Sequence, residues 1–230
     1  MLRPAFAKAF RQLVEPAFRG VLLKAVGLSA IVYLALAGLI LWLLSERIAD
    51  WLQAHAWLAG LAQTLAGLFA VLLLLLLFPA LITAFLGLFL EAIAAAVERR
   101  HYPADPPGRE APAAAALAQG LRFLVVVLGI NLLALPLYLA GIWLPMVNFV
   151  VFYGVNGYLL GREYFVQVSM RHLPPPRATA LRVRHRWTVF WAGVAIAVLL
   201  SVPLLNLVMP VVATAAMVHV FKGLQAARRA

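Results

Sequence analysis

The sequence predicts an all-α integral membrane protein with two long transmembrane helices and two hemi-penetrating, re-entrant helical hairpins. Of its 230 residues, 65% are hydrophobic and 12% are charged, whereas a soluble domain is nearer half apolar and a quarter charged. The charged residues lie between four long charge-free stretches. Two of these stretches carry proline and asparagine near their middle, which predicts turns at membrane depth. No long polar linker divides the chain, so we expect a single membrane domain over residues 1–230.

The first charge-free stretch, residues 25–44, predicts a first span at about 21–44. Its 20 residues make a helix of ~30 Å, the thickness of the hydrocarbon core of a bilayer. Ala35-Leu36-Ala37 resembles the cleavage site of a signal peptide, but the apolar run continues past it to Leu44. A retained helix is therefore favoured over a cleaved signal.

The second stretch, residues 56–90, is too long for one upright crossing, because its 35 residues make ~52 Å of helix. Pro79 offers a break within it. We expect a second span at about 57–78 that continues as a helix to about residue 100. Four residues of this continuation are spaced by four, four and seven, which places them on one helical face: Thr83, Gly87, Glu91 and Glu98.

The third and fourth stretches predict hairpins at about 121–161 and 187–221. Six Lys and Arg residues lie in the gap 162–186, but only Arg47 lies in the gap 45–55. Because Lys/Arg-rich loops stay in the cytoplasm, the N-terminus is predicted to be cytoplasmic, and each hairpin enters and leaves on that side. The expected arms have 11–15 residues, or ~16–22 Å of helix, too short to cross. They are bounded by the prolines, among them Pro136 and Pro210, and cover residues 123–135, 149–161, 188–202 and 211–221. The net charge of +11 has the same explanation, so we expect no nucleic-acid partner.

Four polar residues are candidates for lining or gating a path through the membrane: Glu91, Asn148, Asn206 and Arg162. The two asparagines follow Pro145 and Pro203 in matching Pro-x-x-Asn turns. They either satisfy the backbone of the turn or face a polar path. Glu91 lies at the edge of an apolar run, where a carboxylate is either functional or paired at headgroup level with Arg122 or Arg162.

The start of the first span is a candidate anion site. Pro16 is placed to begin the helix, whose free amides and positive dipole end favour an anion. Arg19 falls in the first turn and offers a planar guanidinium, and Lys24 adds charge about one turn later. The alternative is that Arg19 and Lys24 only anchor the helix at the cytoplasmic surface.

Nothing in the sequence predicts an enzyme. Cysteine is absent, which excludes disulfides and thiolate chemistry, and no zinc, serine-hydrolase or Walker motif is present. We expect no cofactor and no metal.

At these same residues the sequence resembles the CysZ sulfate permease family and the related etoposide-induced-protein-like integral membrane proteins. The start of the first span looks like the family's Gln-Pro-Gly-Ile-Arg-Arg segment: Glu15-Pro16-Ala17-Phe18-Arg19-Gly20. The fourth stretch is similar to its Ile-Pro-Leu-Leu-Asn-Leu hairpin: Val202-Pro203-Leu204-Leu205-Asn206-Leu207. Three further segments look like family motifs: Gly87–Glu91, Leu181–Arg184 and Asn156–Arg162.

The resemblance implies a homo-oligomer in the bacterial-type inner (plasma) membrane that moves sulfate, or a similar oxyanion, to supply cysteine synthesis. It implies a sulfate site at Ala17, Phe18 and Arg19, to which the residue argument adds Lys24. Ala17 stands where the motif has Gly, and Gly20 stands where it has a second Arg. The loss of that Arg is expected to weaken dianion binding unless Lys24 compensates. The alternative function is a non-transporting membrane scaffold or interaction protein of the same fold.

Overall fold

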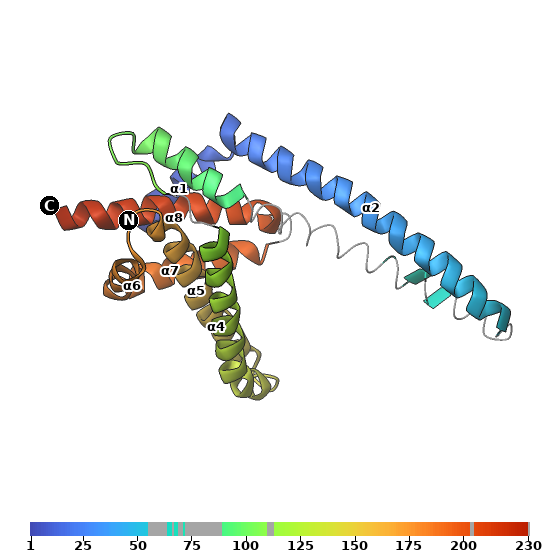
Figure 1. Ribbon diagram of the computed structural model, residues 1–230. Helices are drawn as coiled ribbons and strands as arrows, with labels where there is room; N and C mark the ends of the chain where they lie inside the picture. The colour runs from blue at the N-terminus through green and yellow to red at the C-terminus, as the bar shows by residue number, and fades with distance from the viewer. Residues whose placement is uncertain are drawn as a thin grey trace. The chain divides into compact units, whose positions relative to one another are not determined.

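The computed structural model describes residues 1–54, 64–65, 67–68, 71, 89–109, 113–202 and 205–229, and every regular element within them is a helix. This confirms the all-α fold class (Figure 1). The residues form two compact units, one of Met1–Phe18 with Leu90–Ala230 and one of Arg19–Phe89. Each unit is described by itself. The predicted second span at 57–78, with Pro79, Thr83 and Gly87, lies outside the described residues apart from a few isolated positions.

Most of the second unit that the structure describes is a single helix, α2 (Pro16–Ala54), whose first residues belong to the first unit. Its segment Phe18–Ile40 is long and apolar enough to cross a membrane, as the prediction of a first span at about 21–44 requires. Only 11% of its apolar window is buried within the protein. Large apolar side chains such as Ile31 and Leu34 are exposed, which suits a helix that is surrounded by lipid.

The first unit is built around α8 (Leu205–Arg229). Its segment Leu205–Ala227 is also long and apolar enough to span a membrane, but 83% of its apolar window is buried within the protein. All residues from 211 to 221 are buried. The short arm expected at 211–221 is therefore wrong, because Pro210 lies inside α8 without ending it. Pro210 is the sixth residue of α8, so its missing amide removes one backbone hydrogen bond, a cost that the buried packing of this helix outweighs.

The N-terminal helix α1 (Leu2–Gln12) packs against α8. Its buried residues Ala5, Ala9 and Gln12 are spaced by four and three, which places them on one face. A side chain added at Gly223 of α8 would meet the side chain of Met1. The two ends of the chain are therefore neighbours in this unit.

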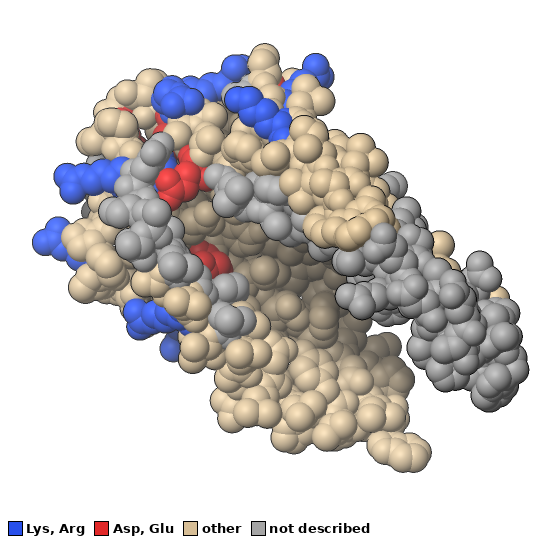
Figure 2. Space-filling model, turned by 45° about the vertical axis from the view of Figure 1, so that its right-hand side comes forward, with Lys and Arg blue, Asp and Glu red and all other residues tan. Residues whose placement is uncertain are grey.

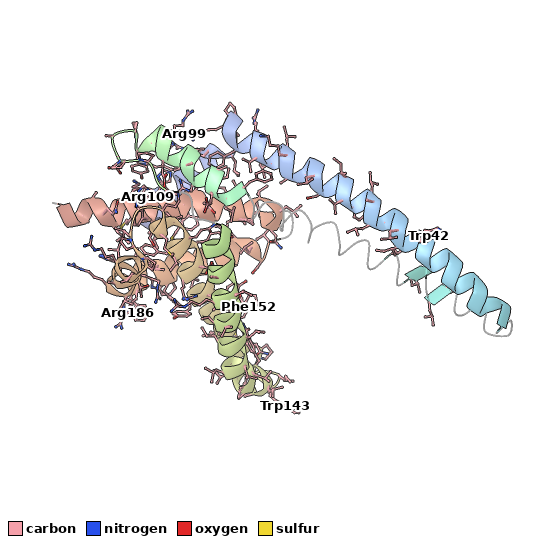
Figure 3. The ribbon with its side chains drawn as sticks, viewed as in Figure 1. Trp42, Arg99, Arg109, Trp143, Phe152 and Arg186 are labelled. Carbon is pink, nitrogen blue, oxygen red and sulfur yellow. The ribbon has the colours of Figure 1, made fainter. Side chains whose placement is uncertain are left out.

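Helices α4 (Ala113–Ala140) and α5 (Pro145–Met170) form the first hairpin. Pro136 does not end α4, and the turn falls at residues 141–144, so the arms are longer than the short ones expected. The charge-free part of α4, residues 123–140, has 18 residues, or ~27 Å of helix, a little less than the ~30 Å of the hydrocarbon core. Trp143 lies at the tip of this hairpin and is 86% exposed (Figure 3).

A sharp bend of 87° joins α6 (Pro175–Arg184) to α7 (Arg186–Leu200). A pair bent in this way is a broken span or a re-entrant loop, which agrees with the predicted fold class, although the bend lies before the hairpin expected at 187–221 and not at its tip. Helix α7 has 15 residues, or ~22 Å, and does not reach across a bilayer by itself.

Helices α5 and α7 cross closely because glycines line both sides of the contact. A Cβ at Gly193 of α7 would collide with the carbonyl oxygen of Gly157, and one at Gly161 would collide with the carbonyl oxygen of Val189. Gly157 and Gly161 form a Gly-x-x-x-Gly pair on α5, the pattern that lets membrane helices approach to backbone contact.

Candidate functional site

The start of α2 is the first candidate site. Phe18 is 1% exposed, and its amide donates to the carbonyl oxygen of Glu15 at 3.1 Å. The backbone amide of Phe18 is therefore already hydrogen-bonded within the turn, so it is not one of the free amides that the sequence predicted for binding an anion. The structure describes the backbone of Ala17 but not its side chain.

At the start of α2, the negative charge is paired and the positive charge is not. The carboxylate of Glu15 lies 3.2 Å from Nε of Arg100, so its negative charge is neutralised. Arg19 and Lys24 are exposed, and no described residue forms an ion pair with either. Near the start of α2, these two exposed cations have no described carboxylate partner.

A buried charged cluster, formed by Glu98, Arg171 and His172, is the most strongly built polar feature of the described residues. Arg171 donates from Nε to Glu98 Oε1 at 3.2 Å and from Nη2 to Glu98 Oε2 at 3.1 Å. His172 Nε2 lies 2.9 Å from Glu98 Oε1. The Arg–carboxylate contact is the bidentate, charge-assisted kind, and Arg171 and Glu98 are almost fully buried.

The loop after the helix at residues 89–101 covers this cluster. The amide of Arg109 donates to the carbonyl oxygen of Arg171 at 2.8 Å. A Cβ at Gly108 would lie 2.9 Å from both Arg171 Nε and Glu98 Oε2. Only glycine lets the backbone pass this close to the ion pair, so the loop and the cluster fit each other.

The pKa of Glu98 reports the strength of these contacts. Burial alone would raise it, but hydrogen bonds from His172 and Arg171 and their charges outweigh burial and lower the pKa to about 2. Glu98 therefore stays ionised at neutral pH. The carboxylate of Glu98 neutralises Arg171, so the cluster is a poor site for a free anion. Its contacts instead join the end of α5 to the helix at residues 89–101.

A second polar group lies between the same loop and α8. Lys222 Nζ donates to Asp105 Oδ2 at 2.9 Å and lies 5.7 Å from the ring centre of Tyr102. Burial and the charge of Asp105 raise the pKa of Tyr102, so its hydroxyl keeps a proton for the 2.8 Å contact with His219 Nδ1. These contacts hold the loop onto α8.

Two cavities reach the buried cluster. One of about 520 Å³ is lined by Glu98, Tyr102, Gly108 and Arg171 among others. The other, of about 730 Å³, is lined by residues that include Arg171, His172 and Lys222. Arg171 lines both, so it lies between two open spaces. Its Nη1 has no hydrogen-bond partner among the described residues.

Glu91, predicted to gate a path, faces this cluster. Its Oε2 lies 4.0 Å from Nη1 of Arg171, which is not one of the arginines expected to pair with it. Glu91 and Glu98 lie on one helical face, as their spacing predicted, and Arg171 approaches both. Glu91 is half-buried, whereas Glu98 is almost fully buried.

The other candidate path residues lie apart from the cluster in the sequence and belong to the hairpins. Asn148 is in the first turn of α5 rather than at the tip, and its side chain packs against Gly141 so closely that a Cβ there would collide with it. Asn206 is exposed at the start of α8, where its backbone N–H donates to the carbonyl oxygen of Val202 at 3.1 Å. Arg162 is half-buried on α5. Their proposed role in a path remains a prediction.

Sequence reasoning missed Arg171, His172, Asp105 and Lys222 as members of one polar region. Arg171 and His172 are 73 and 74 residues from Glu98, and Lys222 is 117 residues from Asp105. No local spacing links residues so far apart. The available signal was Glu98, a second carboxylate on the helical face already assigned to Glu91.

Fold and site together define a helical integral membrane protein that holds a cluster of paired charges in its interior. The model of the family described as "Sulfate transporter CysZ/Etoposide-induced protein 2.4" matches residues 5–210. The chain belongs to this family, and the match supports a role in membrane transport. A search of curated proteins finds no match to the chain.

Proposed function

We propose that the protein transports sulfate or a similar oxyanion across the inner membrane of a bacterial cell and so supplies sulfate for cysteine synthesis. The observation that carries the proposal is the family match over residues 5–210. The proposal places the N-terminus in the cytoplasm and the working form in a homo-oligomer, as the sequence analysis expects.

In this proposal Arg19 is the first group to hold the anion. It is exposed and has no ion-pair partner among the residues that the structure describes, while the nearby carboxylate of Glu15 is neutralised by Arg100. A guanidinium can hold two oxygens of a tetrahedral oxyanion at once. Lys24, about one turn later, adds the second positive charge that Gly20 lacks.

The remaining path residues have supporting roles. Asn148 and Asn206 offer amide groups near the hairpin turns, and Arg162 offers a further guanidinium. Glu91 repels anions unless it is paired or protonated, and its 4.0 Å approach to Arg171 provides such a pair. Glu91 therefore acts as a gate rather than as a binding group.

The test is uptake of labelled sulfate into liposomes that contain the purified protein, beside protein-free liposomes. We expect uptake that other oxyanions suppress, and about a tenfold loss at sub-saturating sulfate in Arg19→Ala, because one charge-assisted contact is lost. Arg11→Ala is the matched control, since Arg11 is also an exposed arginine near the N-terminus but is not part of the site.

Equal uptake by Arg19→Ala and Arg11→Ala would remove Arg19 from the mechanism. Absence of uptake by correctly assembled protein would favour a non-transporting scaffold of the same fold.

A further inference from the structure

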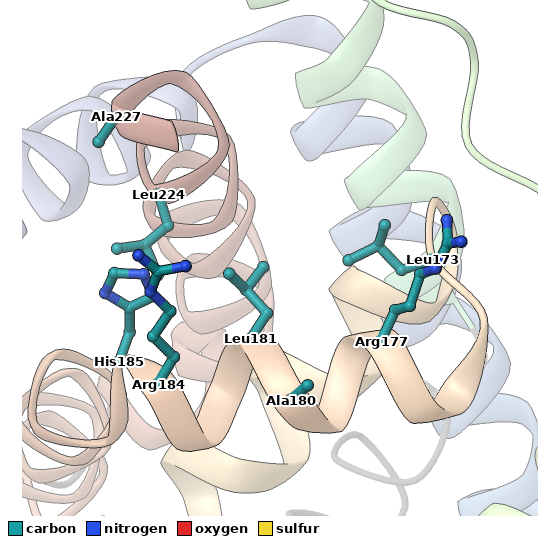
Figure 4. Close-up of a pocket in the computed structure, with 8 residues that line it drawn as sticks. All are labelled: Leu173, Arg177, Ala180, Leu181, Arg184, His185, Leu224 and Ala227. Atoms are coloured by element: carbon teal, nitrogen blue, oxygen red, sulfur yellow. The ribbon is translucent and has the colours of Figure 1, made fainter. Parts of the chain in front are cut away.

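A basic pocket lies between α6 and α8, and Leu173 separates it from the cavity of about 730 Å³ beside the buried cluster, because this residue lines both. Its volume is about 550 Å³. It is lined by Leu173, Arg177, Ala180, Leu181, Arg184, His185, Leu224 and Ala227. Figure 4 shows Arg184 and His185 at one end, beside Leu224 of α8, and Arg177 at the other end, beside Leu173. All these residues belong to the first unit.

The pocket has positive charge without compensation. No acidic residue lines it, and within the described ranges neither Arg177 nor Arg184 has a carboxylate partner. The two arginines are seven residues apart on α6, so they lie on the same side of the helix about two turns from each other. This contrasts with Arg171, whose charge is neutralised by Glu98.

The floor of the pocket is apolar. Leu181 and Leu224 are both buried. Leu173, Ala180 and Ala227 complete the wall. A small hydrated ion gains nothing from such a surface. A ligand that carries both a phosphate group and hydrocarbon would use the arginines and the leucines together.

The position of α6 also points to the membrane surface. It meets α7 at 87°, and a helix at a right angle to one that enters a bilayer upright lies along the membrane surface. Trp187 and Trp191, at the start of α7, are 63% and 56% exposed. Exposed tryptophans of this kind mark the membrane–water interface, and the guanidinium of Arg186 lies 5.7 Å from the ring centre of Trp187.

We propose that this pocket binds the phosphate group of an anionic membrane lipid. Arg177 and Arg184 donate to the phosphate oxygens, and the leucines receive the glycerol and the first carbons of the acyl chains. Basic pockets between helices on the cytoplasmic side are a recognised way to hold such headgroups. The shared chemistry is a tetrahedral phosphate oxyanion, which free inorganic phosphate also supplies, so the test separates the two sources.

The test measures lipid bound to the purified, detergent-solubilised protein by native mass spectrometry. Phosphatidylglycerol is titrated against the parent protein, Arg184→Gln and Arg177→Gln, with zwitterionic phosphatidylcholine titrated in parallel. We expect phosphatidylglycerol binding to weaken about tenfold in each variant, as for the loss of one charge-assisted contact. Phosphatidylcholine should bind at least tenfold more weakly to the parent.

Arg182→Gln is the matched control. It removes the same charge from the same helix, but Arg182 does not line the pocket, so binding should stay within about twofold of the parent. The melting temperature of each variant without lipid confirms that the fold is kept. Equal weakening by Arg182→Gln would overturn the proposal, because it would show a general effect of charge. Equal binding of phosphatidylcholine would overturn it as well.

A competition with millimolar inorganic phosphate separates the two sources of phosphate. Phosphatidylglycerol that stays bound in its presence supports the lipid assignment. Displacement of the bound phosphatidylglycerol by inorganic phosphate at a similar concentration overturns the lipid assignment and makes the pocket a site for soluble oxyanions. None of these outcomes depends on sulfate transport, so failure here and failure of the proposed function are distinguishable.

Discussion

Helices α2 and α8 each contain a 23-residue apolar segment of similar mean hydropathy, yet the protein buries 11% of one apolar window and 83% of the other. The difference follows from what surrounds each helix. Helix α8 is packed against α1, α5 and α7, whereas the described part of α2 buries little beyond Phe18, Ala25 and Ser29 and exposes many large apolar side chains. Length and hydropathy identify a segment that tolerates an apolar environment, and they do not say whether lipid or protein supplies it.

The charges of the first unit sharpen the contrast. Lys222 of α8 is buried against Asp105, and α5 ends at the ion pair of Arg171 with Glu98. The tip of the α4–α5 hairpin carries no charge, and the Lys and Arg side chains of this unit gather at its other end (Figure 2). Protein can neutralise a charge beside an apolar helix, whereas the hydrocarbon chains of lipid cannot.

The comparison predicts its largest effect for truncation of a core side chain. Phe221 of α8 is fully buried and packs edge-on against Phe165, so Phe221→Ala should cost about 3–5 kcal/mol. Leu34→Ala, on the exposed face of α2, should change stability little, because lipid or detergent replaces the lost contacts. Thermal unfolding of both variants in one detergent measures the difference. An equal loss for Leu34→Ala would mean that protein, such as a second copy, covers α2.

A second effect concerns acid. The pKa of Glu98 falls from 4.5 to about 2 on folding, so the stability it contributes is full above pH 4.5 and is lost as the pH falls towards about 2. The loss should be about 3 kcal/mol by linkage. Melting temperature followed from pH 6 downward tests this. In Glu98→Gln that component should be missing, and an unchanged acid profile would assign the acid sensitivity to other carboxylates.

A smaller difference in stability is expected between a glycine at the close contact of α5 with α7 and a glycine on α2. Gly161→Ala should cost about 1–3 kcal/mol, because its Cβ would collide with the backbone of Val189 and only a shift of α7 makes room. Gly27→Ala in α2 meets nothing among the described residues and should stabilise by up to about 1 kcal/mol through helix propensity. Chemical denaturation of both variants provides the measurement. Loss of stability in Gly27→Ala would show a close neighbour at α2.

The sequence predicts these elements to different depths. A charge-free run of membrane length correctly indicated α2, and the spacing of Glu91 and Glu98 correctly placed them on one face. Pro136 and Pro210 were expected to break their stretches, but both lie within continuous helices. A proline removes one amide and adds a local clash, and tertiary packing around α8 outweighs that cost.

The candidate site was less predictable for a physical reason. Arg171 and Glu98 pair only after the helices are packed, and each lies in a segment whose local pattern is ordinary. The same limit applies to the pocket of Arg177 and Arg184. Their charges could be counted as a sign of topology from the sequence, but whether a carboxylate would neutralise them depended on the fold.

The contact between α1 and α8 sets the order in which the protein is completed during translation. Helix α1 is synthesised before the surface of α8 that receives Ala5 and Ala9. With synthesis at ~5–20 residues per second, the delay is roughly 10–40 s. During that time α1 has an apolar face and exposed Arg3, Lys8 and Arg11, the features of a helix that can lie on a bilayer surface. The contact between α1 and α8 can therefore form only after α8 has been synthesised.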